Sequence, residues 1–185
     1  MNLAGFPRKT LRGDRTVHRI HRAVNGPWWF SSSGEGRFDP VGTGHGACYL
    51  ADDALGAWVE VFRLQMVWAE SVVAQRRLLS VELGRDLKLA DLSSSRALRF
   101  GVTATLAAGT DRDVSQAFAA EAIEAGYDGV RYWVRHDPTQ NRPGYAIFDA
   151  AGESANWPAA PSVPLSQELV AEASRTYGYK ILPRP

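Results

Sequence analysis

The side chains that could carry chemistry gather in one stretch of the chain, residues 17–62. This stretch holds paired aromatic residues, glycines, arginines and one carboxylate, Glu60, set among apolar residues. Guanidinium groups bind phosphates through parallel hydrogen bonds and remain charged at any ordinary pH. The mixture is unsuited to a plain apolar core, and it favours a pocket for an anionic ligand.

Glu60 lies on a predicted helix, but away from its apolar stripe. The stripe has the spacing of a buried helical face and consists of Leu55, Trp58, Val59, Phe62 and Met66. Gly56 precedes Glu60 by one turn on the same face, and a glycine there leaves space for a ligand to approach the carboxylate. The alternative is a solvated glutamate paired with Arg63, which stabilises a helix by only about 0.2–0.5 kcal/mol.

Other chemical patterns in the chain are weaker. The glycines of residues 42–46 do not lie between a strand and a helix N-terminus, as a dinucleotide-binding fingerprint requires. His45 and Cys48 have a spacing that metals use, but no second pair of ligands accompanies them, so no metal site is expected. Neither Cys48 nor the serines of residues 31–33 belong to a recognisable nucleophile motif.

The charge balance bears on a nucleic-acid interface. Residues 18–22 could form a basic strip, with Trp28 and Trp29 as stacking platforms. However, the 21 Lys and Arg residues nearly balance the 20 Asp and Glu residues, which gives a net charge of +1. Because affinity for a phosphate backbone needs several basic contacts on one face, direct nucleic-acid binding is not expected.

Length and composition predict one domain over residues 1–185, large enough to bury a proper core. The single cysteine excludes an intramolecular disulfide. No segment approaches the roughly 20 apolar residues of a membrane span, and residues 1–9 lack the apolar run of a signal peptide. We therefore expect a cytoplasmic protein without membrane contact.

Strands and one helix must position the chemical residues. Residues 16–23 alternate as a strand does, with Arg19 on one face and Arg22 on the other, and alternation does not decide which arginine points inward. Residues 47–51 predict a second strand, after which Asp52 or Asp53 can cap the helix of Glu60.

The remaining chain is expected to be scaffold. Residues 1–14 predict a polar lead-in, residues 31–46 an irregular loop, and residues 151–164 a surface connection rich in Pro and Ala. Residues 101–109 give no clear pattern. Further strands are predicted at residues 78–83, 87–92, 130–134, 144–149 and 179–182, and further helices at residues 93–100, 111–125 and 166–177.

Five segments together resemble the RES-domain family, whose members are toxins of bacterial toxin–antitoxin pairs. In chain order they are His18-Arg19-Ile20-His21-Arg22-Ala23, Gly26-Pro27-Trp28-Trp29-Phe30, Gly36-Arg37-Phe38-Asp39-Pro40, Cys48-Tyr49-Leu50-Ala51 and Glu60-Val61-Phe62. The likeness runs from about residue 16 to residue 148, and its later part rests on residues 127–132 and 146–148.

The resemblance implies an α+β fold similar to that of ADP-ribosyltransferases, with a split mixed sheet flanked by helices. It implies Glu60 and Arg19 as catalytic residues, with Arg22 as the alternative register for the arginine. The substrate-binding residues that it implies are Arg22, Arg37, Tyr49 and Tyr132. Tyr49 would stack on the nicotinamide ring, with Trp28 or Trp29 as a helping aromatic residue. The family's serine falls on Val134, which has no hydrogen-bonding side chain. Either a nearby residue such as Arg135 or His136 supplies the contact, or the protein belongs to a branch that does without it, or its activity is reduced.

The resemblance implies an enzyme that degrades NAD⁺ by cleaving the nicotinamide–ribose bond, by hydrolysis or phosphorolysis. The residue types suit this reaction, because a carboxylate such as Glu60 can stabilise an oxocarbenium-like cation. NAD⁺ would be the substrate, and no prosthetic group or metal is expected. The alternatives are a protein mono-ADP-ribosyltransferase with the same site and a catalytically impaired binding domain.

A partner is implied as well. Toxins of this family are usually paired with a small helical DNA-binding antitoxin of the Xre class, which covers the entrance of the active site. A homo-oligomer within that complex is compatible with the resemblance.

Overall fold

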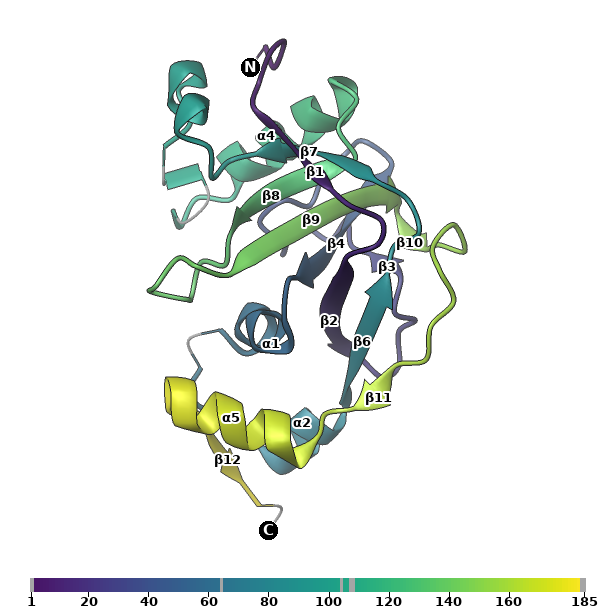
Figure 1. The fold of residues 1–185 in the computed structure, drawn as a ribbon, viewed down its shortest axis with the longest axis vertical. Coiled ribbons are helices and arrows are strands. Elements are labelled where there is room, and N and C mark those ends of the chain that lie inside the picture. Colours follow the sequence, from purple (N-terminus) through teal and green to yellow (C-terminus); the bar gives the residue numbers. More distant parts are fainter. Residues whose placement is uncertain (1, 64, 104, 107–108, 184–185) are drawn as a thin grey trace.

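The computed structural model describes residues 2–63, 65–103, 105–106 and 109–183. Its centre is a mixed sheet with the strand order β1-β7-β8-β9-β4-β2-β6-β11, in which only β7 and β8 are parallel neighbours (Figure 1). The strands of this sheet are β1 (Arg8–Leu11), β2 (Thr16–Arg22), β4 (His45–Ala51), β6 (Arg76–Glu82), β7 (Leu87–Asp91), β8 (Gly129–Trp133), β9 (Pro143–Ala150) and β11 (Val163–Pro164).

The sheet is split between β2 and β4. β2 pairs with β6 along its whole length, but it meets β4 only at His18 and Ala51. The two halves, β1-β7-β8-β9-β4 and β2-β6-β11, run at different angles in Figure 1. The α+β fold with a split mixed sheet flanked by helices, predicted from the sequence, is therefore confirmed.

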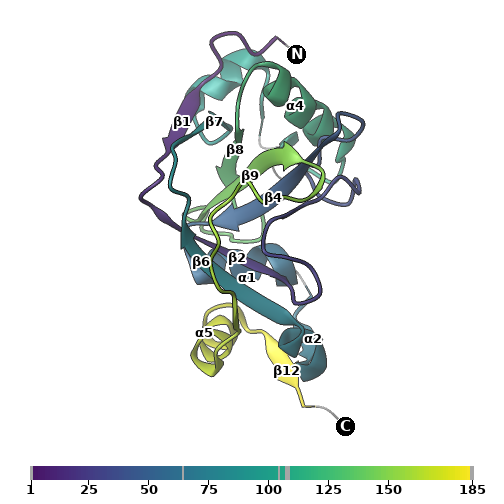
Figure 2. The ribbon, with the colours of Figure 1, turned by 90° about the vertical axis from the view of Figure 1, so that its right-hand side faces the viewer.

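Helices lie near both ends of the sheet. α4 (Asp113–Glu124) and the 3-10 helix η1 (Ser95–Phe100) belong to the half that contains β8. α1 (Ala54–Phe62), α5 (Gln167–Tyr177) and the short α2 (Glu70–Ala74) lie at the other end, near the C-terminus (Figures 1 and 2). Two small ribbons complete the fold: β3 (Trp29–Phe30) with β10 (Gly152–Glu153), and β5 (Val67–Ala69) with β12 (Lys180–Leu182). No helix in the described ranges is long and apolar enough to cross a membrane.

Strand β4 faces two different cores, because alternate residues of a strand point to opposite faces. Tyr49 packs against the cluster that contains Phe38 and Tyr132. Cys48 and Leu50 point the other way, into a separate cluster on the opposite face of the sheet. A third cluster takes Ile20 of β2 and Ala51 at the end of β4.

Helix α1 follows the predicted pattern. Asp53, rather than Asp52, is its N-cap, and its carboxylate accepts a hydrogen bond from the Gly56 amide at 2.6 Å. The predicted stripe is buried except for Met66, which lies beyond the end of the helix and is 38% exposed. Gly56 does not open into a ligand site as expected, because a side chain there would meet the Ala51 Cβ at 3.0 Å. The glycine instead allows the helix to approach β4 closely.

Two segments are more ordered than the sequence indicated. The predicted lead-in contributes β1, an edge strand, and it buries Leu3 and Phe6 in the core. The predicted surface connection buries Trp157, whose ring stacks on Trp28 at a centroid distance of 5.3 Å. β5 and α2 were not predicted. Residues 104 and 107–108 of the unassigned segment lie outside the described residues.

Candidate active site

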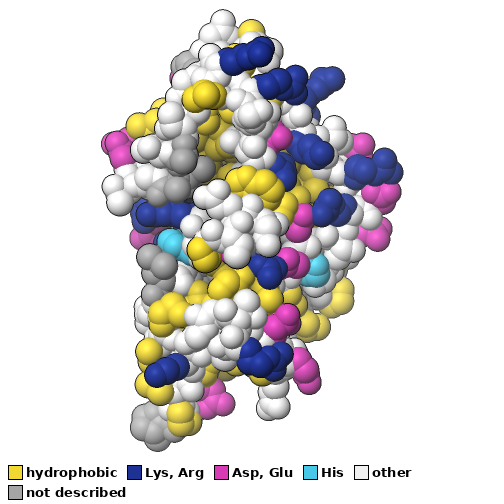
Figure 3. Space-filling view, turned by 60° about the vertical axis from the view of Figure 1, so that its left-hand side comes forward, with side chains coloured by type: hydrophobic (Ala, Val, Ile, Leu, Met, Phe, Trp, Pro, Cys, Tyr) yellow, Lys and Arg dark blue, Asp and Glu magenta, His cyan; other side chains and the backbone are white. Residues whose placement is uncertain are grey.

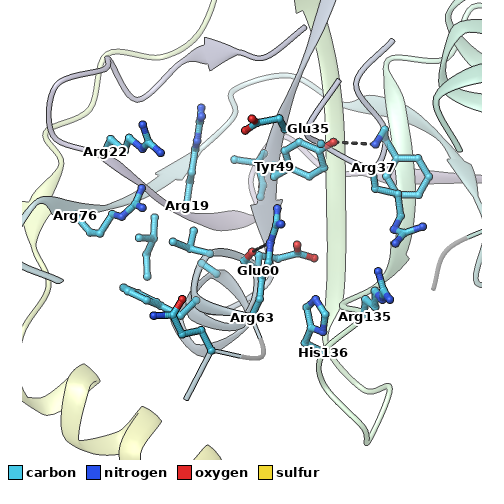
Figure 4. Close-up of a pocket in the computed structure, with 18 of the residues that line it drawn as sticks. Arg19, Arg22, Glu35, Arg37, Tyr49, Glu60, Arg63, Arg76, Arg135 and His136 are labelled. Atoms are coloured by element: carbon cyan, nitrogen blue, oxygen red, sulfur yellow. Dashed lines mark hydrogen bonds between the residues drawn. The ribbon is translucent and has the colours of Figure 1, made fainter. Parts of the chain in front are cut away.

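A cavity of about 540 Å³ opens over the split in the sheet. β2 and β6 contribute one side, β4, β8 and the segment after β3 contribute the other, and α1 supplies the floor (Figure 4). Seven arginines and two glutamates are among the residues that line it: Arg19, Arg22, Arg37, Arg63, Arg76, Arg112 and Arg135, with Glu35 and Glu60. This excess of positive charge suits an anionic ligand.

Glu60 projects from α1 into the middle of this cavity (Figure 4). Its Oε1 atom is buried and has no hydrogen-bond partner among the described residues. Burial raises the pKa of Glu60, whereas Tyr132, Arg63 and Arg37 lower it and offset part of the shift. Since a buried carboxylate oxygen without a partner costs free energy, Glu60 has the character of a functional group rather than of a solvated helix residue.

Tyr132 faces Glu60 from β8. Its hydroxyl is also buried and lacks a hydrogen-bond partner within the described part of the chain. Burial raises the pKa of Tyr132 well above its ordinary value, and the charge of Glu60 raises it further. The two groups act on each other, although their atoms do not meet hydrogen-bond geometry. Both therefore remain available to a ligand that enters between them.

Asp39 fixes the loop after β3, and the sequence reasoning missed this role. Its fully buried carboxylate accepts hydrogen bonds from the Gly36 amide at 3.0 Å, the Tyr49 hydroxyl at 3.0 Å and the Ser31 hydroxyl at 3.0 Å. The Tyr49 hydroxyl in turn accepts from the Phe38 amide at 2.8 Å. The Tyr49 ring is thereby held in place on the cavity wall.

Arg37 is held by oxygen atoms from the neighbourhood of α4. Its guanidinium donates to the Gly109 carbonyl at 2.6 Å, the Leu106 carbonyl at 3.5 Å and the Ser115 hydroxyl at 3.4 Å. Burial lowers the pKa of Arg37, and the charges of Arg135 and Arg112 lower it further. Ser115 is buried and was not predicted as a site residue, because only the fold brings α4 to Arg37.

Arg19 and Arg22 lie on opposite faces of β2, and the structure separates their roles. The Arg19 guanidinium donates to the Trp29 carbonyl at 2.9 Å, to the Pro27 carbonyl and to Cys48 Sγ at 2.6 Å. It borders the cavity but is directed away from Glu60 (Figure 4). Arg22 lines the cavity and has no recorded side-chain hydrogen bond in the described residues. The alternative register, Arg22, thus fits an anion better than Arg19 does.

Trp28 does not line the cavity. It is buried against Trp157, and its indole N–H donates to the Pro158 carbonyl at 2.9 Å. A stacking role for Trp28 on a ligand in this cavity does not fit the geometry. Val134 is buried as well, whereas Arg135 and His136, the two proposed substitutes for the family's serine, do line the cavity.

Arg76 is a third residue that the sequence reasoning missed. It lies directly opposite Arg22 in the register of β2 and β6 and lines the same cavity. The sequence could not reveal it, because strand register is a property of the folded sheet. On the face shown in Figure 3, basic and acidic side chains are interspersed, so that face does not present a continuous basic surface for nucleic acid.

Comparisons with known proteins agree with this description. The family model described as RES domain matches residues 16–168. A chain in the crystal structure of the M. tuberculosis MbcT–MbcA toxin–antitoxin complex has a similar fold, with a TM-score of 0.70 and 23% sequence identity, over 90% of this chain and 92% of that chain. No curated protein sequence matches significantly. At 23% sequence identity, this likeness supports the fold of the chain described above.

Proposed function

The chain belongs to the RES-domain family, and from this premise we propose that it is the toxin of a toxin–antitoxin pair that cleaves the nicotinamide–ribose bond of NAD⁺. The observation that carries the proposal is the buried Glu60 oxygen without a hydrogen-bond partner, in a cavity lined by arginines. An electronegative group placed against the ribose stabilises the oxocarbenium-like cation that forms when the bond breaks.

The proposed roles follow from the geometry of the cavity. Glu60 faces the ribose, and its ionised form stabilises the cation. Arg37 contributes a fixed positive charge near the phosphates of NAD⁺, and on the other side of Glu60 the Arg22 guanidinium is left open by the other described residues. Tyr49 offers an aromatic surface whose hydroxyl is tied to Asp39, and the free Tyr132 hydroxyl lies beside Glu60.

Nicotinamide leaves as a neutral molecule, so the reaction needs no general acid at the leaving group. Water or inorganic phosphate then takes the ribosyl cation. A side chain of another protein as acceptor would make the enzyme a mono-ADP-ribosyltransferase with the same site. We propose NAD⁺ as a substrate rather than as a bound cofactor, and we propose the cytoplasm as the location.

An antitoxin is the partner that we propose. The structurally similar chain comes from a toxin–antitoxin complex, which supports an antitoxin partner for this chain, and the Xre class is what the family resemblance implies. An antitoxin that covers the cavity would block NAD⁺ from Glu60, so the free toxin and the complex should differ in activity.

The test is to incubate the purified protein with NAD⁺, with and without inorganic phosphate, and to measure free nicotinamide by chromatography. We expect nicotinamide to appear, and a phosphate requirement would identify phosphate as the acceptor. Labelled ADP-ribose on lysate proteins would instead support the transferase. Absence of nicotinamide release from protein whose circular dichroism shows an intact fold would contradict the proposal.

A further inference from the structure

The cavity contains two groups of arginines, on opposite sides of Glu60. Arg37 and Arg135 lie on one side, and Arg22 and Arg76 lie on the other (Figure 4). Arg37 and Arg63 lower the pKa of Glu60, whereas burial and the charge of Arg22 lower the pKa of Arg76. The second group lies on β2 and β6, apart from the helix that carries the carboxylate.

The Arg22–Arg76 pair is unfavourable by itself. The two residues are direct cross-strand neighbours, and like charges in that position repel each other. Arg76 is half-buried, and burial together with the charge of Arg22 lowers its pKa. Among the described residues, neither guanidinium has a recorded ion pair or side-chain hydrogen bond.

The surroundings of the pair favour a ligand over bulk solvent. Ile20, Val61 and Trp68 line the same cavity and form an apolar wall. The Trp68 indole N–H donates to the Gln65 carbonyl at 2.6 Å, and its ring packs edge-on against Phe62 at a centroid distance of 5.2 Å, so the ring is fixed. A planar ring in the same cavity as two guanidiniums is a combination that can bind a phosphate together with the organic group that carries it.

We infer that Arg22 and Arg76 form a second phosphate-binding subsite of this cavity, distinct from the arginines around Glu60. Two guanidiniums that have no protein carboxylate beside them carry two positive charges, which a dianion can balance. A phosphate dianion also offers the oxygen atoms that two planar donors require. The inference rests on the proposed function for the identity of the ligand, but the binding itself does not depend on bond cleavage.

Two sources can supply such a phosphate. NAD⁺ carries a single pyrophosphate, which the arginines around Glu60 can bind. The second phosphate is then either free inorganic phosphate or a phosphate monoester on the dinucleotide, as in NADP⁺. Both sources share the chemistry that the pair recognises, and a binding experiment separates them.

The experiment measures binding by isothermal titration calorimetry, with inorganic phosphate, NAD⁺ and NADP⁺ as ligands. The full-length protein carries Glu60→Gln, so that no ligand is consumed. Arg22→Gln and Arg76→Gln remove the pair one residue at a time. Arg77→Gln is the matched control, because Arg77 is next to Arg76 in β6, pairs with His21 and does not line the cavity.

We expect the pair variants to lose phosphate binding about tenfold to hundredfold, and the Arg77 variant to stay within about twofold. If free phosphate is the ligand, inorganic phosphate binds the protein that carries Glu60→Gln alone, and NAD⁺ and NADP⁺ bind that protein with equal affinity. If the dinucleotide supplies the phosphate, NADP⁺ binds at least about tenfold more tightly than NAD⁺, and Arg76→Gln removes that preference.

Three results would overturn the subsite. The first is that the protein neither binds inorganic phosphate nor prefers NADP⁺ over NAD⁺. The second is that Arg77→Gln loses as much affinity as the variants of the pair. The third is that the variants of the pair lose affinity for NAD⁺ alone, which would assign the pair to the pyrophosphate. A melting temperature that falls in unliganded Arg76→Gln would indicate a structural role instead, since removing a repulsive charge should not destabilise the protein. Failure of the proposed function would appear separately, as missing nicotinamide release.

Discussion

The two sides of the cavity hold their positive charge in different ways. On the Arg37 side, the guanidinium is fixed by two carbonyls and Ser115, and the loop that carries it is fixed by Asp39. On the Arg22–Arg76 side, like charges face each other without recorded partners in the described chain. The first side is held in place by the protein, and we infer that a phosphate completes the second. Glu60 lies between them.

The same contrast appears within strand β2. Arg19 and Arg22 are three residues apart, yet Arg19 donates to Cys48 and to two carbonyls on one face, whereas Arg22 has no side-chain partner among the described residues on the other. Residue type therefore does not distinguish a structural arginine from a binding arginine. The acceptors that surround each guanidinium do.

The largest effect is expected at Glu60, which lies between the two groups of arginines. Glu60→Gln keeps the shape of the side chain but removes the charge that stabilises the ribosyl cation. We expect kcat for nicotinamide release to fall about 100-fold to 1000-fold. Glu35→Gln, at the other carboxylate of the cavity, serves as the control and should change kcat by less than about threefold, because Glu35 is exposed. Equal losses in both variants would remove the special role of Glu60.

On the preorganised side, Arg37→Lys should lower kcat/KM by about tenfold to hundredfold. Lysine keeps the charge but cannot donate to several fixed acceptors and a phosphate at the same time. Steady-state kinetics with NAD⁺ measure the effect, and Arg175→Lys on the exposed face of α5 is the matched control. Unchanged kcat/KM for Arg37→Lys would show that charge alone, and not fixed geometry, matters on this side.

The loop that supports Arg37 can be disturbed without touching the arginine. A Cβ at residue 36 would lie 2.1 Å from Asp39 Oδ1 and 2.5 Å from the Tyr49 hydroxyl. Gly36→Ala should therefore lower the free energy of unfolding by about 1–3 kcal/mol and reduce activity. Urea denaturation measures the stability. Ser32→Ala, at an exposed residue of the same loop, should change neither quantity.

The smallest effect concerns the pH dependence of stability. Because the pKa of Glu60 is raised in the folded protein, ionising this residue costs stability as the pH rises through that pKa. Glu60→Gln should be more stable than the wild type at pH 8, by on the order of 1 kcal/mol, and the difference should disappear below the ordinary glutamate pKa. Wild-type activity should rise over the same pH range in which Glu60 ionises. Thermal melts measure the difference in stability between Glu60→Gln and the wild type at pH 4 and at pH 8. An equal difference at the two pH values would contradict a raised pKa for Glu60.

Sequence patterns predicted the parts of the site that depend on local structure. The alternation of residues 16–23 gave a strand, and Asp53 at the start of an apolar stripe gave the helix that carries Glu60. The parts that depend on tertiary structure were missed or misread. Arg76 reaches the site through strand register, and Trp28 is buried by Trp157, which is more than a hundred residues away in the sequence. Gly56 serves the close packing of a helix on a strand, which its position in the sequence did not reveal.

The central claim is that the cavity around Glu60 binds NAD⁺ with its nicotinamide ribose against the carboxylate. A crystal structure of the Glu60→Gln variant with NAD⁺ tests it most directly. We predict the ribose between residue 60 and Tyr132, with the pyrophosphate on arginines of the same cavity. NAD⁺ bound outside this cavity, or bound within it with the nicotinamide ribose remote from residue 60, would contradict the account.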